Sequence, residues 1–112
     1  MNNPEYIKNL CGHNVRIVSN GDSDALLEAS IGTNGFKGGD YGHGGRHYLS
    51  LCDFFELLDM RVRIRFRDGE VVQYEEEVKE IEIFLSGDWE LHGLLKAVEH
   101  FHKTLKEQAG EN

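Results

Sequence analysis

The sequence predicts an α+β fold, with a single antiparallel sheet of about five strands and a C-terminal amphipathic helix packed on one face. Three observations support this class. Apolar residues alternate along several segments, short turn signals separate these segments, and one helical repeat of apolar residues closes the chain. The length of 112 residues fits one domain spanning 1–112.

The first half of the chain predicts three strands. Strands at 14–19 and 24–31 flank a turn signal at 20–22, and a third is expected over 46–54, ending in a helical turn or bend at 54–58. The segment 24–31 alternates with the period of a strand, although its Ala, Leu and Glu residues also favour a helix. The turn before it favours the strand, because the two segments then form a hairpin.

The clearest strand covers 60–67, where four apolar residues alternate with four arginines. The Asp68-Gly69 pair after it predicts a hairpin turn. A two-residue loop would place carboxylates on the apolar face of the hairpin. A three-residue loop with Gly69 in the left-handed region instead pairs Ile64 with Val72, and we expect this register.

The returning strand is expected from 71 towards 85, but its apolar residues change parity along the way. Such a change predicts a bulge or a break, and the run 75–77 of three glutamates is the obvious position.

A helix is predicted over 89–108, because its apolar residues recur at spacings of three and four. Asp88 is expected to cap its N-terminus, and Gly110 lies just past its end. Trp89 is expected to cover the sheet edge as part of the core, with contact to a partner as the alternative.

The charge of the chain is negative and uneven. The net charge is −8, and residues 51–112 contribute −7 of it through 8 basic and 15 acidic residues. This balance disfavours direct binding to nucleic acid or to an anionic membrane and favours a protein partner with a basic surface. Two cysteines without a CxxC motif, and no apolar leader at the N-terminus, predict a cytoplasmic protein.

Residues 33–47 form a long Gly-rich loop, since seven of the 14 residues in 32–45 are glycine. Exposed backbone amides can hold an anion, an arginine can bind phosphate or carboxylate, and an aromatic ring can stack on a ligand. No Walker A or GxGxxG pattern is present, and an irregular connection or a protein-binding loop are the alternatives. The predicted ligand-binding residues are Asn34, Lys37, Asp40, Tyr41, His43, Arg46 and His47.

Two catalytic arrangements are weaker alternatives. Asp40, His43 and His47 have a spacing that would suit an open zinc site in a metal-assisted hydrolase, but their glycine surroundings would hold it poorly. Cys52 with a loop histidine outlines a Cys–His nucleophile, although a lone cysteine usually packs as a small apolar residue. We expect no cofactor and favour a non-enzymatic role.

The leading hypothesis is a small acidic binding protein that acts by protein–protein interaction. One concrete form is a phage or mobile-element inhibitor of a host nucleic-acid-handling system, whose carboxylates imitate phosphates. The alternatives are a small-molecule, nucleotide or anion-binding (sequestering) protein that uses loop 33–47, and the metal-assisted hydrolase. Ion pairs with the arginine row could also account for the acidic residues, and an uncovered sheet edge would allow a homodimer. The predicted partner-binding residues are Glu75, Glu76, Glu77, Glu80 and Glu82.

Overall fold

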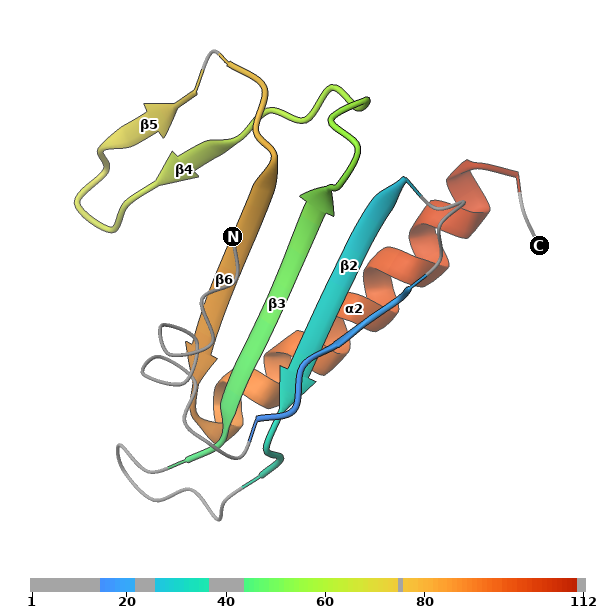
Figure 1. The fold of residues 1–112 in the computed structure, drawn as a ribbon. Helices are drawn as coiled ribbons and strands as arrows, with labels where there is room; N and C mark the ends of the chain where they lie inside the picture. Colours follow the sequence, from blue (N-terminus) through green and yellow to red (C-terminus); the bar gives the residue numbers. More distant parts are fainter. Residues whose placement is uncertain (1–14, 22–25, 37–43, 75, 111–112) are drawn as a thin grey trace.

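The computed structural model describes residues 15–21, 26–36, 44–74 and 76–110. Within these residues the fold is α+β, with a four-stranded antiparallel sheet in the order β1-β2-β3-β6, a separate two-stranded sheet and one long helix (Figure 1). The elements are β1 (Val18–Ser19), β2 (Leu27–Thr33), β3 (Arg46–Asp53), β4 (Arg63–Arg65), β5 (Val71–Gln73), β6 (Glu80–Ser86) and α2 (Asp88–Gln108).

The α+β class is therefore confirmed, but the prediction of one sheet with about five strands is wrong. The β4–β5 hairpin forms its own sheet beside β6. The predicted returning strand is interrupted, because β5 ends at Gln73 and β6 begins at Glu80. The glutamate run falls in this gap, so the change of parity marks a break between two sheets.

The predicted hairpin register is confirmed. Ile64 pairs with Val72, and the Phe66 amide donates to the Glu70 carbonyl at 2.7 Å. Gly69 has a φ of 95°, in the region that favours glycine. The three-residue loop keeps Ile64 and Val72 on one apolar face.

The strand prediction for the segment after the first turn is also confirmed, since β2 pairs along its whole length with β3. The predicted strand 14–19 is shorter, with only Val18–Ser19 paired to β2. Before Val18 the chain crosses over β2 (Figure 1). A Cβ at Gly32 would lie 2.7 Å from the Arg16 carbonyl oxygen, so the crossing depends on glycine there.

The helix agrees with the prediction to within one residue, but its cap differs. Gly87 occupies the N-cap position, and no side chain caps the helix. The Asp88 carboxylate instead accepts a hydrogen bond from the Gly45 amide at 3.2 Å. Trp89 is 84% exposed, so the prediction that it belongs to the core is wrong. The helix directs this ring away from the sheet edge, against His92.

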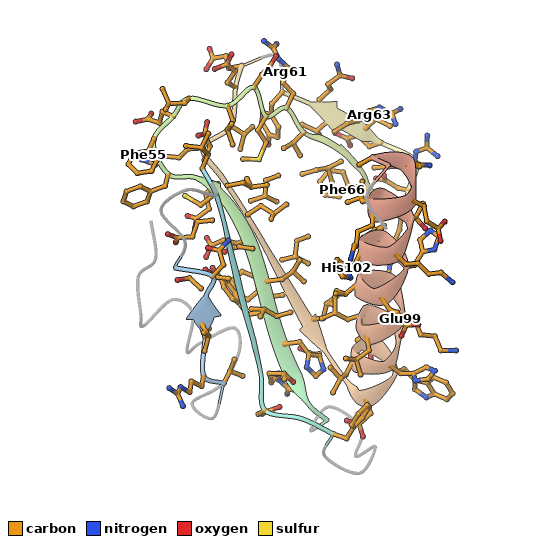
Figure 2. The ribbon with its side chains drawn as sticks, turned by 90° about the vertical axis from the view of Figure 1, so that its right-hand side faces the viewer. Phe55, Arg61, Arg63, Phe66, Glu99 and His102 are labelled. Atoms are coloured by element: carbon orange, nitrogen blue, oxygen red, sulfur yellow. The ribbon has the colours of Figure 1, made fainter. Side chains whose placement is uncertain are left out.

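The two faces of the four-stranded sheet are packed very differently. On the face that we call the closed face, Tyr48 is fully buried against Val15, Ile17 and Phe84. The other face, which we call the open face, looks towards α2. The helix begins beside the end of β6 and crosses this face diagonally, and the hairpin projects from the same side (Figures 1 and 2). Only Leu91 of α2 is buried.

Candidate binding surface

The described residues of the Gly-rich loop are used to hold the fold together. The Asn34 side-chain oxygen accepts from the Arg46 amide at 2.7 Å, and the Asn34 amide donates to the Arg46 carbonyl. The Arg46 guanidinium donates to the Gly44 carbonyl at 2.7 Å. These contacts extend the β2–β3 ladder beyond its last strand pair. The predicted ligand residues Lys37, Asp40, Tyr41 and His43 lie outside the described residues.

His47 is a structural residue with no exposed surface. Its Nε2 lies 2.7 Å from the Gly87 carbonyl, which can only accept, so Nε2 carries the proton. Its Nδ1 then accepts from the Thr33 hydroxyl at 2.8 Å, and that hydroxyl also accepts from the Gly35 amide. His47 therefore joins β2 to the β6–α2 junction, and neither ring nitrogen is left for a metal.

The described part of the chain gives no support to the catalytic arrangements. It contains no group of three or more His, Cys, Asp or Glu side chains that could hold a metal ion. Cys52 lies five residues from His47 on β3, so their side chains point to opposite faces of the sheet. Burial raises the pKa of the Cys52 thiol, and nearby Glu80 adds to the rise, which disfavours the nucleophilic thiolate.

The predicted acidic residues separate into two groups. Glu80 and Glu82 lie on the closed face, and the Glu82 carboxylate accepts from the Tyr48 hydroxyl at 2.8 Å. Glu76 and Glu77 are exposed beyond the sheet, with Glu77 3.9 Å from Arg61. Glu75 lies outside the described residues. Glu82 therefore stabilises the core. Glu76, Glu77 and Glu80 lie near the end of the sheet at which β3 ends.

A rigid turn follows β3 at this end of the sheet. Asp53 is only 3% exposed, and its carboxylate accepts from the amides of Leu57 and Leu58, both at 3.0 Å. The Asp53 carbonyl also accepts from the Glu56 amide at 3.1 Å, with Glu56 in the left-handed region at a φ of 57°. A carboxylate that binds two amides fixes the conformation of the turn.

The turn displays three large apolar side chains, which together we call the apolar turn: Phe54, Phe55 and Leu57. They are 56%, 50% and 72% exposed. The ring centroids of Phe54 and Phe55 lie 5.1 Å apart, in an edge-to-face arrangement. Figure 2 shows Phe55 extending away from the sheet. The sequence predicted a turn or bend here but no site. The signal was present as adjacent aromatic residues directly after a strand-ending aspartate.

Acidic residues lie beside the apolar turn in the chain and in the segment that is bonded to it. The segment after the glutamate run is tied to it, since the Asp53 amide donates to the Lys79 carbonyl and the Val78 amide to the Met60 carbonyl, both at 2.7 Å. Lys79 lies 3.8 Å from Glu56. We call the carboxylates of these two segments the acidic rim: Glu56, Asp59, Glu76, Glu77 and Glu80. Arg61 and Lys79 are the basic residues of the same segments.

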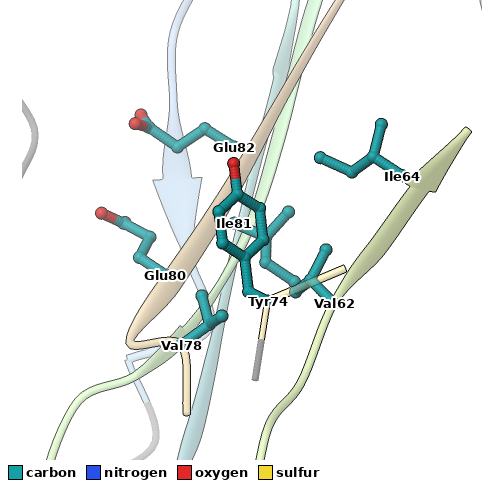
Figure 3. Close-up of a pocket in the computed structure, with 7 residues that line it drawn as sticks. All are labelled: Val62, Ile64, Tyr74, Val78, Glu80, Ile81 and Glu82. Atoms are coloured by element: carbon teal, nitrogen blue, oxygen red, sulfur yellow. The ribbon is translucent and has the colours of Figure 1, made fainter. Parts of the chain in front are cut away.

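A separate hollow lies between the hairpin and β6. Figure 3 shows Val62, Ile64 and Tyr74 of the hairpin facing Ile81, whereas Glu80 and Glu82 extend from the other side of β6. The hollow has a volume of about 360 Å³ and a mainly apolar lining. It continues the apolar surface of the open face.

Comparison with known proteins identifies no relative. No protein-family model matches the chain, and no curated protein or solved structure is similar to it at a significant level. Among the described residues, no helix has both the length and the apolar character needed to span a membrane.

Proposed function

We propose that this chain is a non-enzymatic protein-binding protein whose anchor is the apolar turn. The observation that carries the proposal is that Phe54, Phe55 and Leu57 are at least half exposed on a turn fixed by a buried carboxylate. Exposed aromatic side chains are the usual anchors of protein interfaces when they enter a pocket of the partner.

The hydrogen bonds of Asp53 favour binding because they order the turn in advance. A flexible loop loses conformational freedom when it binds, at a cost that reduces affinity. The two amide bonds to the Asp53 carboxylate hold the turn in one conformation without a partner. The apolar turn can therefore dock with little further ordering.

The acidic rim defines the chemistry of the partner. An apolar centre within a polar border is the common plan of a protein interface. Five carboxylates against one arginine and one lysine favour a partner whose pocket has basic residues around it, and they speed the encounter at low salt. An enzyme that handles nucleic acid has such a basic surface, and the acidic rim would compete there with phosphates.

No observation on the described residues favours the ligand-binding alternative. Asn34, Arg46 and His47 direct their polar atoms to the backbone or to neighbouring side chains of this chain.

The test compares two phenylalanines with equal exposure. Phe54 and Phe36 are both 56% exposed, but Phe36 lies outside the apolar turn. The full chain is immobilised, and proteins captured after chemical crosslinking are compared between wild type, Phe54→Ser and Phe36→Ser. We expect a partner that is lost with Phe54→Ser and retained with Phe36→Ser. Retention with Phe54→Ser would contradict the proposal, and loss with Phe36→Ser alone would favour the Gly-rich loop.

A second variant tests the rim. Glu76→Lys with Glu77→Lys should weaken capture of the same partner and reduce its salt dependence, because attraction across the rim is screened by salt. An unchanged salt dependence would remove the acidic rim from the interface.

A further inference from the structure

The open face carries a second, larger apolar surface. Two hollows lie between the sheet and α2, with volumes of about 250 Å³ and 490 Å³. Ile31 and Val98 line both, so the two hollows adjoin each other. We call this space, with the apolar sides of α2 and the hairpin that border it, the apolar cleft.

The side chains around the apolar cleft are too exposed for a finished core. Nine large apolar side chains from all three structural units expose between 38% and 64% of their surface. The radius of gyration of 15.5 Å also exceeds the roughly 13 Å expected for a compact domain of this length. The nine side chains are Ile31, Leu51, Ile83, Ile64, Phe66, Leu95, Val98, Phe101 and Leu105.

We infer that a second copy of this chain fills the apolar cleft, so that the protein is a two-fold symmetric dimer with α2 packed against α2. The spacing of the helix supports this partner. Apolar residues at Leu91, Leu94, Val98, Phe101 and Leu105 follow each other at intervals of three and four, which is the pattern of a helix seam. Leu91 is covered by this chain, whereas Phe101 and Leu105 are 62% and 64% exposed.

The charges beside the seam fit a second copy better than a basic partner. Between Leu91 and Leu105, the positions flanking the seam are Leu95, Ala97, His102 and Thr104. None of these four residues is an aspartate, glutamate, lysine or arginine. Two copies that each carry a net charge of −8 repel one another wherever their charged surfaces meet. The apolar cleft, where Glu99 is the one charged residue lining the two hollows, is where they can approach. A basic helix would require carboxylates there, but Glu99 is the one acidic residue lining the two hollows.

The area of the apolar cleft is sufficient for a stable dimer. Aromatic side chains bury about 150–250 Å² each. With about 200 Å² as an upper value for each of the nine side chains, which are on average half exposed, the apolar cleft offers roughly 900 Å². A standard interface buries about 800 Å² on each partner. In a two-fold dimer the same surface is used by both copies, so the apolar cleft of each copy is closed by the other.

Sedimentation equilibrium of the full chain tests this inference. We expect wild type to be a dimer at micromolar concentration. Leu105→Glu should raise the dissociation constant roughly 100-fold or more, because it buries a charge without a partner, and should leave the helical circular dichroism unchanged. Phe101→Ser is a second variant that disrupts the same seam without adding charge.

Two control variants place the effect on the cleft. His100→Glu adds the same charge on the outer side of α2, and Leu57→Glu adds it to the apolar turn; both should remain dimeric. The reverse experiment separates this inference from the proposed function, since Phe54→Ser should abolish partner capture and still dimerise. A monomeric wild type would overturn the inference. A dimer that persists in both Leu105→Glu and Phe101→Ser would overturn it as well.

Discussion

The two faces of the four-stranded sheet show that apolar character and burial are not the same property. The closed face carries small and polar residues around Tyr48, yet Ser30 and Ser50 are 7% and 3% exposed. The open face carries Ile31 and Ile83, which are 48% and 43% exposed. The difference follows from what covers each face. The chain crosses directly onto the closed face at a glycine, whereas α2 crosses the open face at a distance.

Polar side chains form hydrogen bonds at both ends of the open face. His47 bonds to the β6–α2 junction at one end, and Asp53 holds the turn at the other. Between them lie the apolar residues that this chain leaves exposed. We interpret the open face as an interface with fixed ends, and the following experiments test its contrast with the closed face.

The largest expected effect is on the closed face. Tyr48→Ala removes a fully buried ring that packs against Phe84, with the two ring centroids 5.2 Å apart. We expect the free energy of unfolding to fall by about 3–5 kcal/mol. Ile31→Ala on the open face should cost less than about 1.5 kcal/mol in dilute, monomeric protein, because the side chain is already half exposed. Equal losses in urea denaturation would show that the two faces do not differ.

The next effect concerns the end of the open face. Asp53→Ala leaves the amides of Leu57 and Leu58 without their carboxylate. We expect a loss of about 2–3 kcal/mol in the free energy of unfolding, together with weaker partner capture by the apolar turn. Asp53→Asn keeps one acceptor oxygen and should recover part of both. Normal capture by Asp53→Ala would mean that the order of the turn is irrelevant to binding.

A smaller effect tests the crossing that covers the closed face. A Cβ at Gly32 would lie 2.7 Å from the Arg16 carbonyl oxygen and 2.9 Å from Val15 Cγ1. Gly32→Ala should therefore destabilise the fold by about 1–2 kcal/mol. Gly93 in α2 is the matched control, since a Cβ there meets nothing within 4 Å. Gly93→Ala should stabilise the fold by up to about 1 kcal/mol in thermal unfolding. The same sign for both substitutions would argue against a tight crossing.

A further effect, confined to alkaline pH, is a pH dependence specific to the closed face. Burial raises the pKa of Tyr48 from 10.0 to about 12, and the Glu82 carboxylate adds to the rise. Below pH 10 the hydroxyl is protonated in both states and its contribution is complete. As pH rises from about 10 to about 12, the unfolded chain loses this proton first, so the free energy of unfolding falls. Tyr48→Phe should show a shallower fall over this range in urea denaturation, and an identical slope would contradict the assignment.

The sequence predicted the elements because they depend on local patterns. Alternation identified β2, the Asp68-Gly69 pair located the hairpin, and the helical repeat located α2. The hairpin register followed from the pairing of apolar residues such as Ile64 and Val72 across it. The arrangement of these elements depends on contacts distant in sequence. The change of parity indicated a bulge or a break at the glutamate run, but it did not show that the hairpin beyond it forms a separate sheet.

The candidate site was predicted less well than the fold. Glu76, Glu77 and Glu80 remain in the proposed rim, whereas Glu82 is bonded to Tyr48 and His47 is a buried junction residue. A histidine beside a Gly-rich loop has the same appearance in sequence whether its ring is free or bonded to Thr33 and Gly87. The apolar turn was missed because the sequence predicted a helical turn or bend at 54–58 but not the exposure of its apolar side chains. The exposed fractions of 56% and 50% in the folded chain show that Phe54 and Phe55 point outward.

The open face should be accessible in one copy of the chain and covered in two. Carbene footprinting of the full chain, read by mass spectrometry at increasing protein concentration, measures this difference. Tyr48 should be protected at every concentration, because no part of it is exposed. Phe101 and Leu105 should be labelled in dilute protein and protected as the dimer forms. Protection of Phe101 and Leu105 in dilute protein would contradict the account, because this chain would then cover its own open face.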